Sequence, residues 1–283
     1  MSPAYILGIS HQGYDDEYDA YFFDKVLPVF DTAAGLSFEY ADLKKFQNVE
    51  CPAPLAESAA NRNMMRIARK LVRDRFENYL NTRIQNWNDV GDAKTQAMVR
   101  AAHADAASRY ATSLSEYGVM MAIGDHPLNA APRLGRPGVA SFLRARRPAM
   151  VFDSIDEDKD MFDAYCGAGQ DRPLLLQIQL VAASDLEDVR NRGRQRAAEE
   201  FRRSLEQGVF ARSDVELSQQ GARSLLCERN QKWLGKIKNA MEQKPTFFAL
   251  GLAHLMPAAA KNVPCDDLLS ALRREGMLVD LIR

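Results

Sequence analysis

The segments Pro245–Leu255, PTFFALGLAHL, and Ala4–His11, AYILGISH, repeat one pattern at opposite ends of a 283-residue chain. Each is a short apolar run followed by Gly-x-x-His, and the motifs end at His254 and His11. Short apolar runs bounded by glycine are typical of buried strands. The chain has only four histidines, so two in this one context predict that both chain ends contribute to one sheet and one site.

Further elements follow outward from these two runs. Leu36–Phe38 predicts a second strand and Asp24–Ala33 a helix before it, and a strand, helix and strand favour parallel strands with a right-handed crossover. Ala149–Phe152 and Met277–Ile282 predict two more strands. Helices are expected over Leu55–Gln85, Ala93–Tyr117, Val139–Arg146, Leu174–Gln207, Asp214–Met241 and Asp266–Glu275.

These elements predict the α/β class. We expect a single domain over residues 1–283, with a mixed β-sheet formed from both chain ends, a largely helical middle and a helical insertion at 55–120. The composition, 46% hydrophobic and 27% charged, is that of a packed protein. With 37 basic and 38 acidic residues the net charge is -1, which provides no attraction for nucleic acid or anionic membranes. We therefore expect no nucleic-acid partner.

Two features bear on the compartment. Cys51, Cys166, Cys227 and Cys265 are far apart and form no CxxC motif, which indicates reduced, mostly buried thiols rather than a zinc ribbon or a disulfide scaffold. The start MSPAYILGISH lacks the basic and apolar stretches of a signal peptide, and no apolar run has transmembrane length. We expect a cytoplasmic protein, or a periplasmic or secreted one if a leader has been removed.

The Gly-x-x-His motifs predict a metal site. Gly8 and Gly251 would let the backbone leave its strand in a conformation that other residues resist. Open α/β sheets bind ligands at the carboxyl ends of their strands, so His11 and His254 are expected to face one point. Imidazoles together with a carboxylate are a common shell for a transition metal.

Two carboxylates follow other expected strands, Glu39 in GLSFEYAD and Asp153 in AMVFDSID. An acidic side chain at a buried strand end is unfavourable unless it is paired or bound to metal. We expect His11, Glu39 and His254 to hold a divalent ion, with Asp153 as general base or as the group that orients the attacking water. Asp153 also fits a helix N-cap, because SIDEDKD is acidic in the manner of a first helical turn.

The chain resembles the TraB/GumN family, which is related to the Tiki metalloproteases. ERNQKW at Glu228–Trp233, followed by PTFFALGLAHL and DDLLSALRREGMLVDLIR, resembles the family's closing signature, and GISH resembles its first Gly-x-x-His. HPLN at His126–Asn129 and GVASFLRARRPAMVFDS at Gly138–Ser154 are similar to its linker and third strand. The resemblance spans the whole chain and is loosest between Leu55 and Tyr117.

The resemblance implies a metal-dependent peptidase or related hydrolase, on a fold shared with erythromycin-esterase-like proteins. Manganese or cobalt is the implied ion, with zinc as a further option. By position, His11, Glu39 and His254 match the metal-site motifs, and Arg229 and Asn230 match an Arg-Asn pair. A guanidinium can fix a carboxylate, and a carboxamide can donate to a developing oxyanion.

Asp153 stands where the family usually has the longer Glu, which puts its reach to a metal in question. Two other functions stay open: a metal-independent esterase of the erythromycin-esterase kind with His as general base, and a binding or signalling module without turnover. The expected substrate is a peptide or a small ester or amide. The sequence does not define an oligomeric state.

Overall fold

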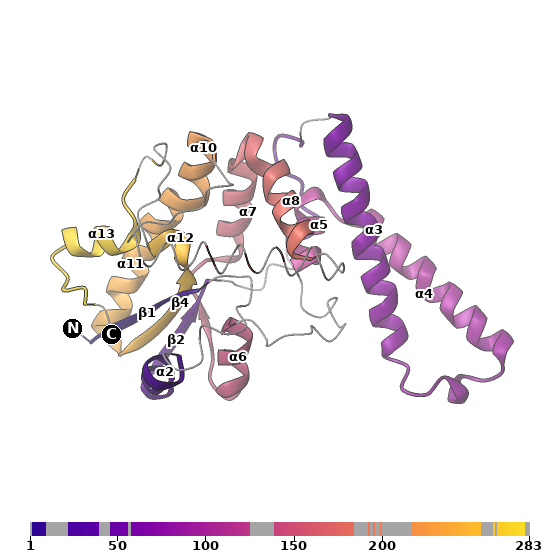
Figure 1. The fold of residues 1–283 in the computed structure, drawn as a ribbon, viewed down its shortest axis with the longest axis horizontal. Helices are drawn as coiled ribbons and strands as arrows, with labels where there is room; N and C mark the ends of the chain where they lie inside the picture. The colour runs from indigo at the N-terminus through magenta and orange to yellow at the C-terminus, as the bar shows by residue number, and fades with distance from the viewer. Residues whose placement is uncertain are drawn as a thin grey trace. The chain divides into compact units, whose positions relative to one another are not determined.

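The structure is a computed structural model that describes residues 2–9, 22–39, 46–55, 58–124, 139–183, 217–255 and 265–280, and the single residues 192, 195, 199 and 263. The chain forms two compact units (Figure 1). The first comprises Met1–Leu43, Gly135–Asp171 and Leu186–Arg283, and the second comprises Lys44–Leu134 and Arg172–Asp185.

The first unit contains β1 (Ala4–Ile9), η1 (Phe22–Val26), α2 (Leu27–Thr32), β2 (Gly35–Phe38), α6 (Val139–Arg146), β3 (Asp153–Ser154), α7 (Asp158–Gly167), η5 (Gly169–Asp171), α10 (Gln219–Ala222), η6 (Arg223–Cys227), α11 (Glu228–Gln243), β4 (Thr246–Gly251), α12 (Leu252–Leu255) and α13 (Leu268–Arg274). The second contains α3 (Ala59–Thr82), η3 (Trp87–Val90), α4 (Ala93–Ser113), α5 (Glu116–Gly124) and α8 (Arg172–Ala182).

A parallel sheet joins the two chain ends. Its order is β1-β4-β2-β3, and every pairing among the described strands is parallel. Gly8 of β1 lies opposite Leu250 of β4, and Ile9 lies opposite Gly251. The α/β class and the sheet built from both ends are therefore confirmed, although the described sheet is parallel rather than mixed. β1 and β2 are parallel as expected, but β4 lies between them.

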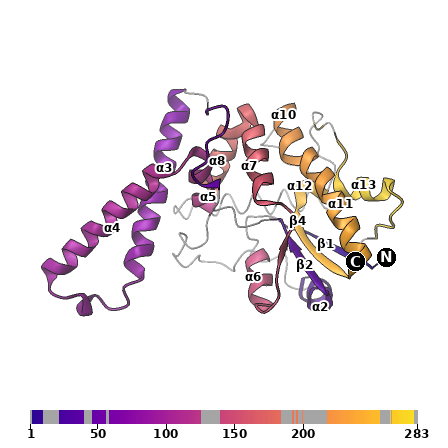
Figure 2. The same cartoon turned by 180° about the vertical axis from the view of Figure 1, so that it is seen from behind.

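Successive side chains of β4 point to opposite faces of the sheet and pack into two separate hydrophobic clusters. Phe247 and Ala249 pack with apolar side chains of η1, α2, β2 and α6. Phe248 and Leu250 pack on the opposite face with side chains of α11 and α13. Figures 1 and 2 show α2 and α6 on one side of the sheet and α11 and α13 on the other. Because helices cover both faces, β1, β2 and β4 are mostly apolar, as is usual in parallel sheets.

Two expected strands differ in the structure. β3 is Asp153–Ser154 instead of Ala149–Phe152. Met150 N–H donates to the Arg147 carbonyl at 3.0 Å, and this turn after α6 delays the entry of the chain into the sheet. The described part of the last expected strand, residues 277–280, does not join the sheet, and residues 281 and 282 lie outside the described residues.

The second unit is helical, as the sequence predicts for 55–120. Arg69 of α3 donates to the carbonyls of Ala111 and Leu114 at 2.6 and 2.9 Å, so it caps the end of α4. The helix expected over Ala93–Tyr117 is consequently two helices, α4 and α5. The helix expected up to Gln207 is described as α8, and most of its later part lies outside the described residues. No described helix has both the length and the apolar character needed to cross a membrane.

Gly8 has a different role from the expected one. Neither Gly8 nor Gly251 has a positive φ, so neither motif uses the special backbone freedom of glycine. A Cβ at Gly8 would lie 2.8 Å from Leu252 Cδ1 and 3.2 Å from Leu255 Cδ1. Its missing side chain therefore allows α12, the turn that contains His254, to pack against β1.

Gly8→Val is expected to lower the free energy of unfolding by about 1–3 kcal/mol, because the added side chain overpacks the contact with α12. Urea unfolding followed by circular dichroism measures this change. Gly235→Ala is the matched control: a Cβ at Gly235 of α11 would meet nothing within 4 Å, so alanine should add up to about 1 kcal/mol through helix propensity. Equal stability of Gly8→Val and the parent protein would contradict the close packing of α12.

Candidate functional site

Three buried polar side chains lie at the carboxyl ends of the strands. Glu39 follows β2 directly, Asp156 comes two residues after β3, and His254 lies in α12 after β4. Their exposed fractions are 4%, 2% and 3%. Parallel strands end at the same edge of a sheet, and open α/β sheets bind ligands there. The three side chains therefore occupy the usual position of a functional site.

Arg229, in the first turn of α11, joins these three side chains. Its Nη2 donates to Glu39 Oε1 and to Asp156 Oδ2, each at 2.6 Å. Its Nη1 lies 3.1 Å from His254 Nε2. Arg229 is itself buried, and buried charges persist only when they are paired and hydrogen-bonded. One guanidinium is thus the shared cation of two buried carboxylates.

The hydrogen bonds of His254 define its tautomer. Its Nδ1 lies 2.7 Å from Asn230 Oδ1, while Asn230 Nδ2 donates to the carbonyls of His254 and Asp266, each at 3.4 Å. The acceptor oxygen of Asn230 requires that Nδ1 bears the proton. Arg229 can only donate, so Nε2 is the unprotonated nitrogen. A histidine fixed in this way presents Nε2 as a metal ligand or as a base.

Glu39 faces the same point as His254. Its Oε2 accepts from Gly251 N–H at 2.8 Å, and its Oε1 lies 3.9 Å from His254 Nε2. A single ion at about 2.1 Å from each atom is compatible with that separation. No group of three potential metal-binding side chains occurs among the described residues, and the third expected ligand, His11, lies outside them. Glu39 and His254 therefore fit as two ligands of the implied ion.

Trp233, one turn further along α11, contacts three members of the cluster. Its Nε1 donates to Asp156 Oδ1 at 2.6 Å. The indole centroid is 4.7 Å from Arg229 Cζ and 4.2 Å from the centroid of the His254 ring. A guanidinium over the face of a tryptophan is a favourable cation–π contact. Trp233 is fully buried, so it fixes these neighbours from inside the fold.

Burial and charge set the protonation of the cluster. Burial raises the pKa of Asp156 and the Glu39 charge adds to the rise, although Arg229 and Trp233 act against it. For Arg229, burial disfavours the charged form, but Glu39 and Asp156 outweigh it and raise the pKa of the guanidinium. The guanidinium is therefore always charged, and two carboxyl groups share this one cation.

Four of the expected side chains, those of Glu39, Arg229, Asn230 and His254, lie in this cluster. Asp153 does not: it is exposed on β3. Because β3 begins later than expected, Asp156 follows the strand end in its place.

The sequence reasoning did not find Asp156 and Trp233. Asp156 lies in the acidic segment SIDEDKD, where several carboxylates compete for the same role. Trp233 stands four residues after Arg229 on α11, a spacing that places two side chains on one face of a helix. That spacing was the available signal for Trp233.

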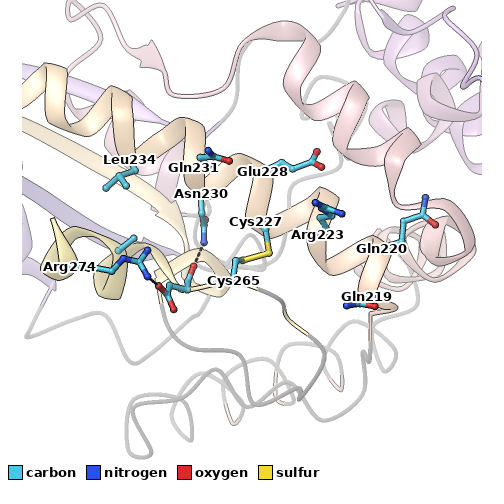
Figure 3. Close-up of a pocket in the computed structure, with 12 residues that line it drawn as sticks. Gln219, Gln220, Arg223, Cys227, Glu228, Asn230, Gln231, Leu234, Cys265 and Arg274 are labelled. Atoms are coloured by element: carbon cyan, nitrogen blue, oxygen red, sulfur yellow. Dashed lines mark hydrogen bonds and ion pairs between the residues drawn. A yellow bond between two sulfur atoms is a disulfide. The ribbon is translucent and has the colours of Figure 1, made fainter.

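A disulfide beside the cluster corrects the expectation of reduced thiols. Cys227 and Cys265 are bonded to each other, and none of the four cysteines is a free thiol. The bond connects the end of η6, just before α11, to the segment that precedes α13. Figure 3 shows it in the wall of a cavity of about 930 Å³, next to Asn230. The other lining residues are Gln219, Gln220, Arg223, Glu228, Gln231, Leu234, Asp266, Ala271 and Arg274.

Comparison with protein families gives a match over part of the chain. The sequence model of the TraB/PrgY/gumN family matches residues 140–275. This segment includes Asp156, Arg229, Asn230, Trp233 and His254, whereas Glu39 lies before it. No curated protein and no solved structure matches the chain.

Arg229→Met is expected to lower the free energy of unfolding by about 3–5 kcal/mol, because it leaves two buried carboxylates without their cation. Buried carboxyl groups without a partner have raised pKa values, so the stability that they contribute is present at low pH and is lost as pH rises. The deficit should therefore be larger at about pH 8 than at about pH 5. Urea unfolding at both pH values measures it.

Arg274→Met is the matched control. Arg274 pairs with Asp266, and the exposed fractions of these side chains are 67% and 43%. Exposed ion pairs contribute at most about 1 kcal/mol, so a small change at both pH values is expected. An Arg229→Met deficit as small as that of Arg274→Met would contradict the central role of Arg229.

Proposed function

Residues 140–275 of this chain belong to the TraB/PrgY/gumN family, and on this premise we propose that the protein is a metal-dependent hydrolase that cleaves peptide bonds. The observation that supports this best is the convergence of Glu39 Oε1 and His254 Nε2, 3.9 Å apart at the carboxyl edge of the sheet. Imidazole and carboxylate ligands with an open position are the usual shell of a hydrolytic metal site.

His11, Glu39 and His254 are the proposed ligands. Manganese or cobalt is the proposed ion, and zinc suits the same donor atoms. When bound, the ion would polarise the scissile carbonyl and activate a water molecule. Support for His11 comes from the register of the sheet: Ile9 lies opposite Gly251, so the chain leaves β1 at the edge where β4 leads to His254.

Arg229 and Asn230 are proposed to hold the ligands rather than to contact substrate. Asn230 accepts from His254 Nδ1–H and so keeps the Nε2 lone pair available. Arg229 holds Glu39 and Asp156. Both side chains are buried and engaged, which supports positioning over the oxyanion role considered for Asn230 from the sequence. We assign no role in the reaction to Asp153, because it is exposed.

The proposed substrate is a peptide, with a small ester or amide as the nearest other class. A metal-independent esterase would use His254 Nε2 as its base, and a binding module would retain the cluster without turnover. Of these three functions, only the metallohydrolase needs a bound metal ion for turnover. Metal binding is therefore the first measurement.

Protein purified without a histidine tag and stripped with a chelator is expected to rebind Mn²⁺ or Co²⁺, measured by isothermal titration calorimetry. His254→Gln and Glu39→Gln should each weaken binding by at least about tenfold and abolish hydrolysis of a peptide panel. His103→Gln is the matched control, since His103 Nδ1 pairs with Asn81 Oδ1 at 2.8 Å within the second unit. Ester turnover without any ion would support the esterase instead, and absence of both binding and turnover would support the binding module.

We also propose that the protein works in an oxidising compartment. Disulfides persist in periplasmic and secreted proteins and are rare in the reducing cytosol, which favours those locations over the cytoplasmic one expected from the lack of signal-peptide features. In protein alkylated directly on cell lysis, Cys227 and Cys265 should react with a maleimide only after reduction, as mass spectrometry can show. Labelling before reduction would argue for a reducing compartment.

A further inference from the structure

Arg229 lies at the point on which the proposed metal ligands converge. Its Nη1 is 3.1 Å from His254 Nε2, and its Nη2 is 2.6 Å from Glu39 Oε1. The unprotonated nitrogen of an imidazole has a single lone pair, so Nε2 can accept from Arg229 or bind an ion, but not both at once. The guanidinium must therefore release His254 before an ion can bind there.

Asp156 is an anion that can retain the guanidinium without either ligand. Its Oδ2 accepts from Arg229 Nη2 at 2.6 Å, and its Oδ1 accepts from Trp233 Nε1, also at 2.6 Å. The indole ring also lies against the guanidinium, 4.7 Å from Cζ to centroid. Asp156 and Trp233 therefore bind Arg229 through a carboxylate and an aromatic face, and neither belongs to the proposed ligand set.

The guanidinium is not fully satisfied in the arrangement described. Its Nε is buried and has no hydrogen-bond partner in the described part of the chain. Buried donors without partners are uncommon in folded proteins. The arrangement described therefore leaves one donor of the guanidinium unused.

Electrostatic repulsion also requires the guanidinium of Arg229 to move away from Glu39 and His254 when an ion binds. A divalent ion at Glu39 and His254 would repel a guanidinium left between them, and this repulsion is strong where water is excluded. Movement of the guanidinium towards Asp156 relieves the repulsion and leaves one carboxylate for each cation. The two buried carboxylates are thus matched to an ion and an arginine, rather than to the arginine alone.

We propose that Arg229 and a divalent ion exchange places at Glu39 and His254, and that Asp156, fixed by Trp233, holds the guanidinium while the ion is bound. This inference rests on the proposed function. Asp156 and Trp233 are positioning residues in it, because they act on the metal site through Arg229.

The two tryptophans of the chain allow a spectroscopic test. In Trp87→Phe, Trp233 is the single indole, and its ring lies 4.2 Å from that of His254, so paramagnetic Co²⁺ should quench its fluorescence. In the same Trp87→Phe background, His254→Gln should remove the quenching, because it removes a proposed ligand of the ion. In ¹⁵N-labelled Trp87→Phe, saturation with Zn²⁺ should shift the Arg229 side-chain N–H signals, while the Trp233 indole N–H keeps its hydrogen-bonded shift.

A double-mutant cycle tests whether Asp156 acts through Arg229. Asp156→Asn should weaken Zn²⁺ binding by about 10–100-fold when Arg229 is present, and by much less in the Arg229→Met background. Asp160→Asn is the control for loss of a carboxylate, because Asp160 is also buried but pairs with Lys232. If Arg229→Met does not fold, the Zn²⁺ titration of Trp87→Phe decides alone.

The outcomes separate the exchange from the proposed function. Zn²⁺ binding with unchanged Arg229 signals, or equal effects of Asp156→Asn in both backgrounds, would overturn the exchange and leave the metallohydrolase intact. Absence of any binding of Co²⁺ or Zn²⁺ would overturn both. Shifted Arg229 signals together with a non-additive cycle would establish the exchange.

Discussion

The contact on which the site depends is the pairing of one buried guanidinium with two buried carboxylates. Arg229 reaches Glu39 and Asp156 with the same nitrogen, Nη2, each at 2.6 Å. Carboxylates buried without a cation would be strongly unfavourable. The order β1-β4-β2-β3 brings them together, because Glu39 and Asp156 follow neighbouring parallel strands and His254 follows the strand on the other side of β2.

Helix α11 supplies the rest of the cluster from little more than one turn. Arg229 donates to the carboxylate of Glu39, and Asn230 accepts from His254 Nδ1. Trp233 donates to Asp156 Oδ1. The Cys227–Cys265 disulfide fixes the chain just before this turn, and Asn230 donates to the carbonyl of the residue after Cys265. The start of α11 is therefore held covalently at the place where its side chains must be aligned most accurately.

The sequence predicts the class, the sheet built from both chain ends, and Glu39 and His254 of the cluster, because short apolar runs and Gly-x-x-His motifs are local signals. Arg229 and Asn230 come from the resemblance of Glu228–Trp233 to the family's Arg-Asn pair. It places β3 too early because the apolar run Ala149–Phe152 is typical of a strand, although Pro148 is a typical second residue for the turn at Arg147–Met150. That error replaced Asp156 with Asp153. The Cys227–Cys265 pairing was missed because 38 residues separate the cysteines, and only the packing of α11 and α13 brings them together.

The exchange of Arg229 for an ion would also set how tightly the ion is held. Binding energy at a site is measured against the state without the ligand, and here that state is already stabilised by Arg229 pairing with Glu39 and His254. Part of the free energy gained when Glu39 and His254 bind the ion is therefore offset by the loss of their contacts with Arg229. A structural metal site gains from having no such competitor, whereas a hydrolytic one needs an open position and ligands that remain in place when the ion leaves. An internal cation meets the second need, because it keeps Glu39 and His254 aligned in the ion-free protein.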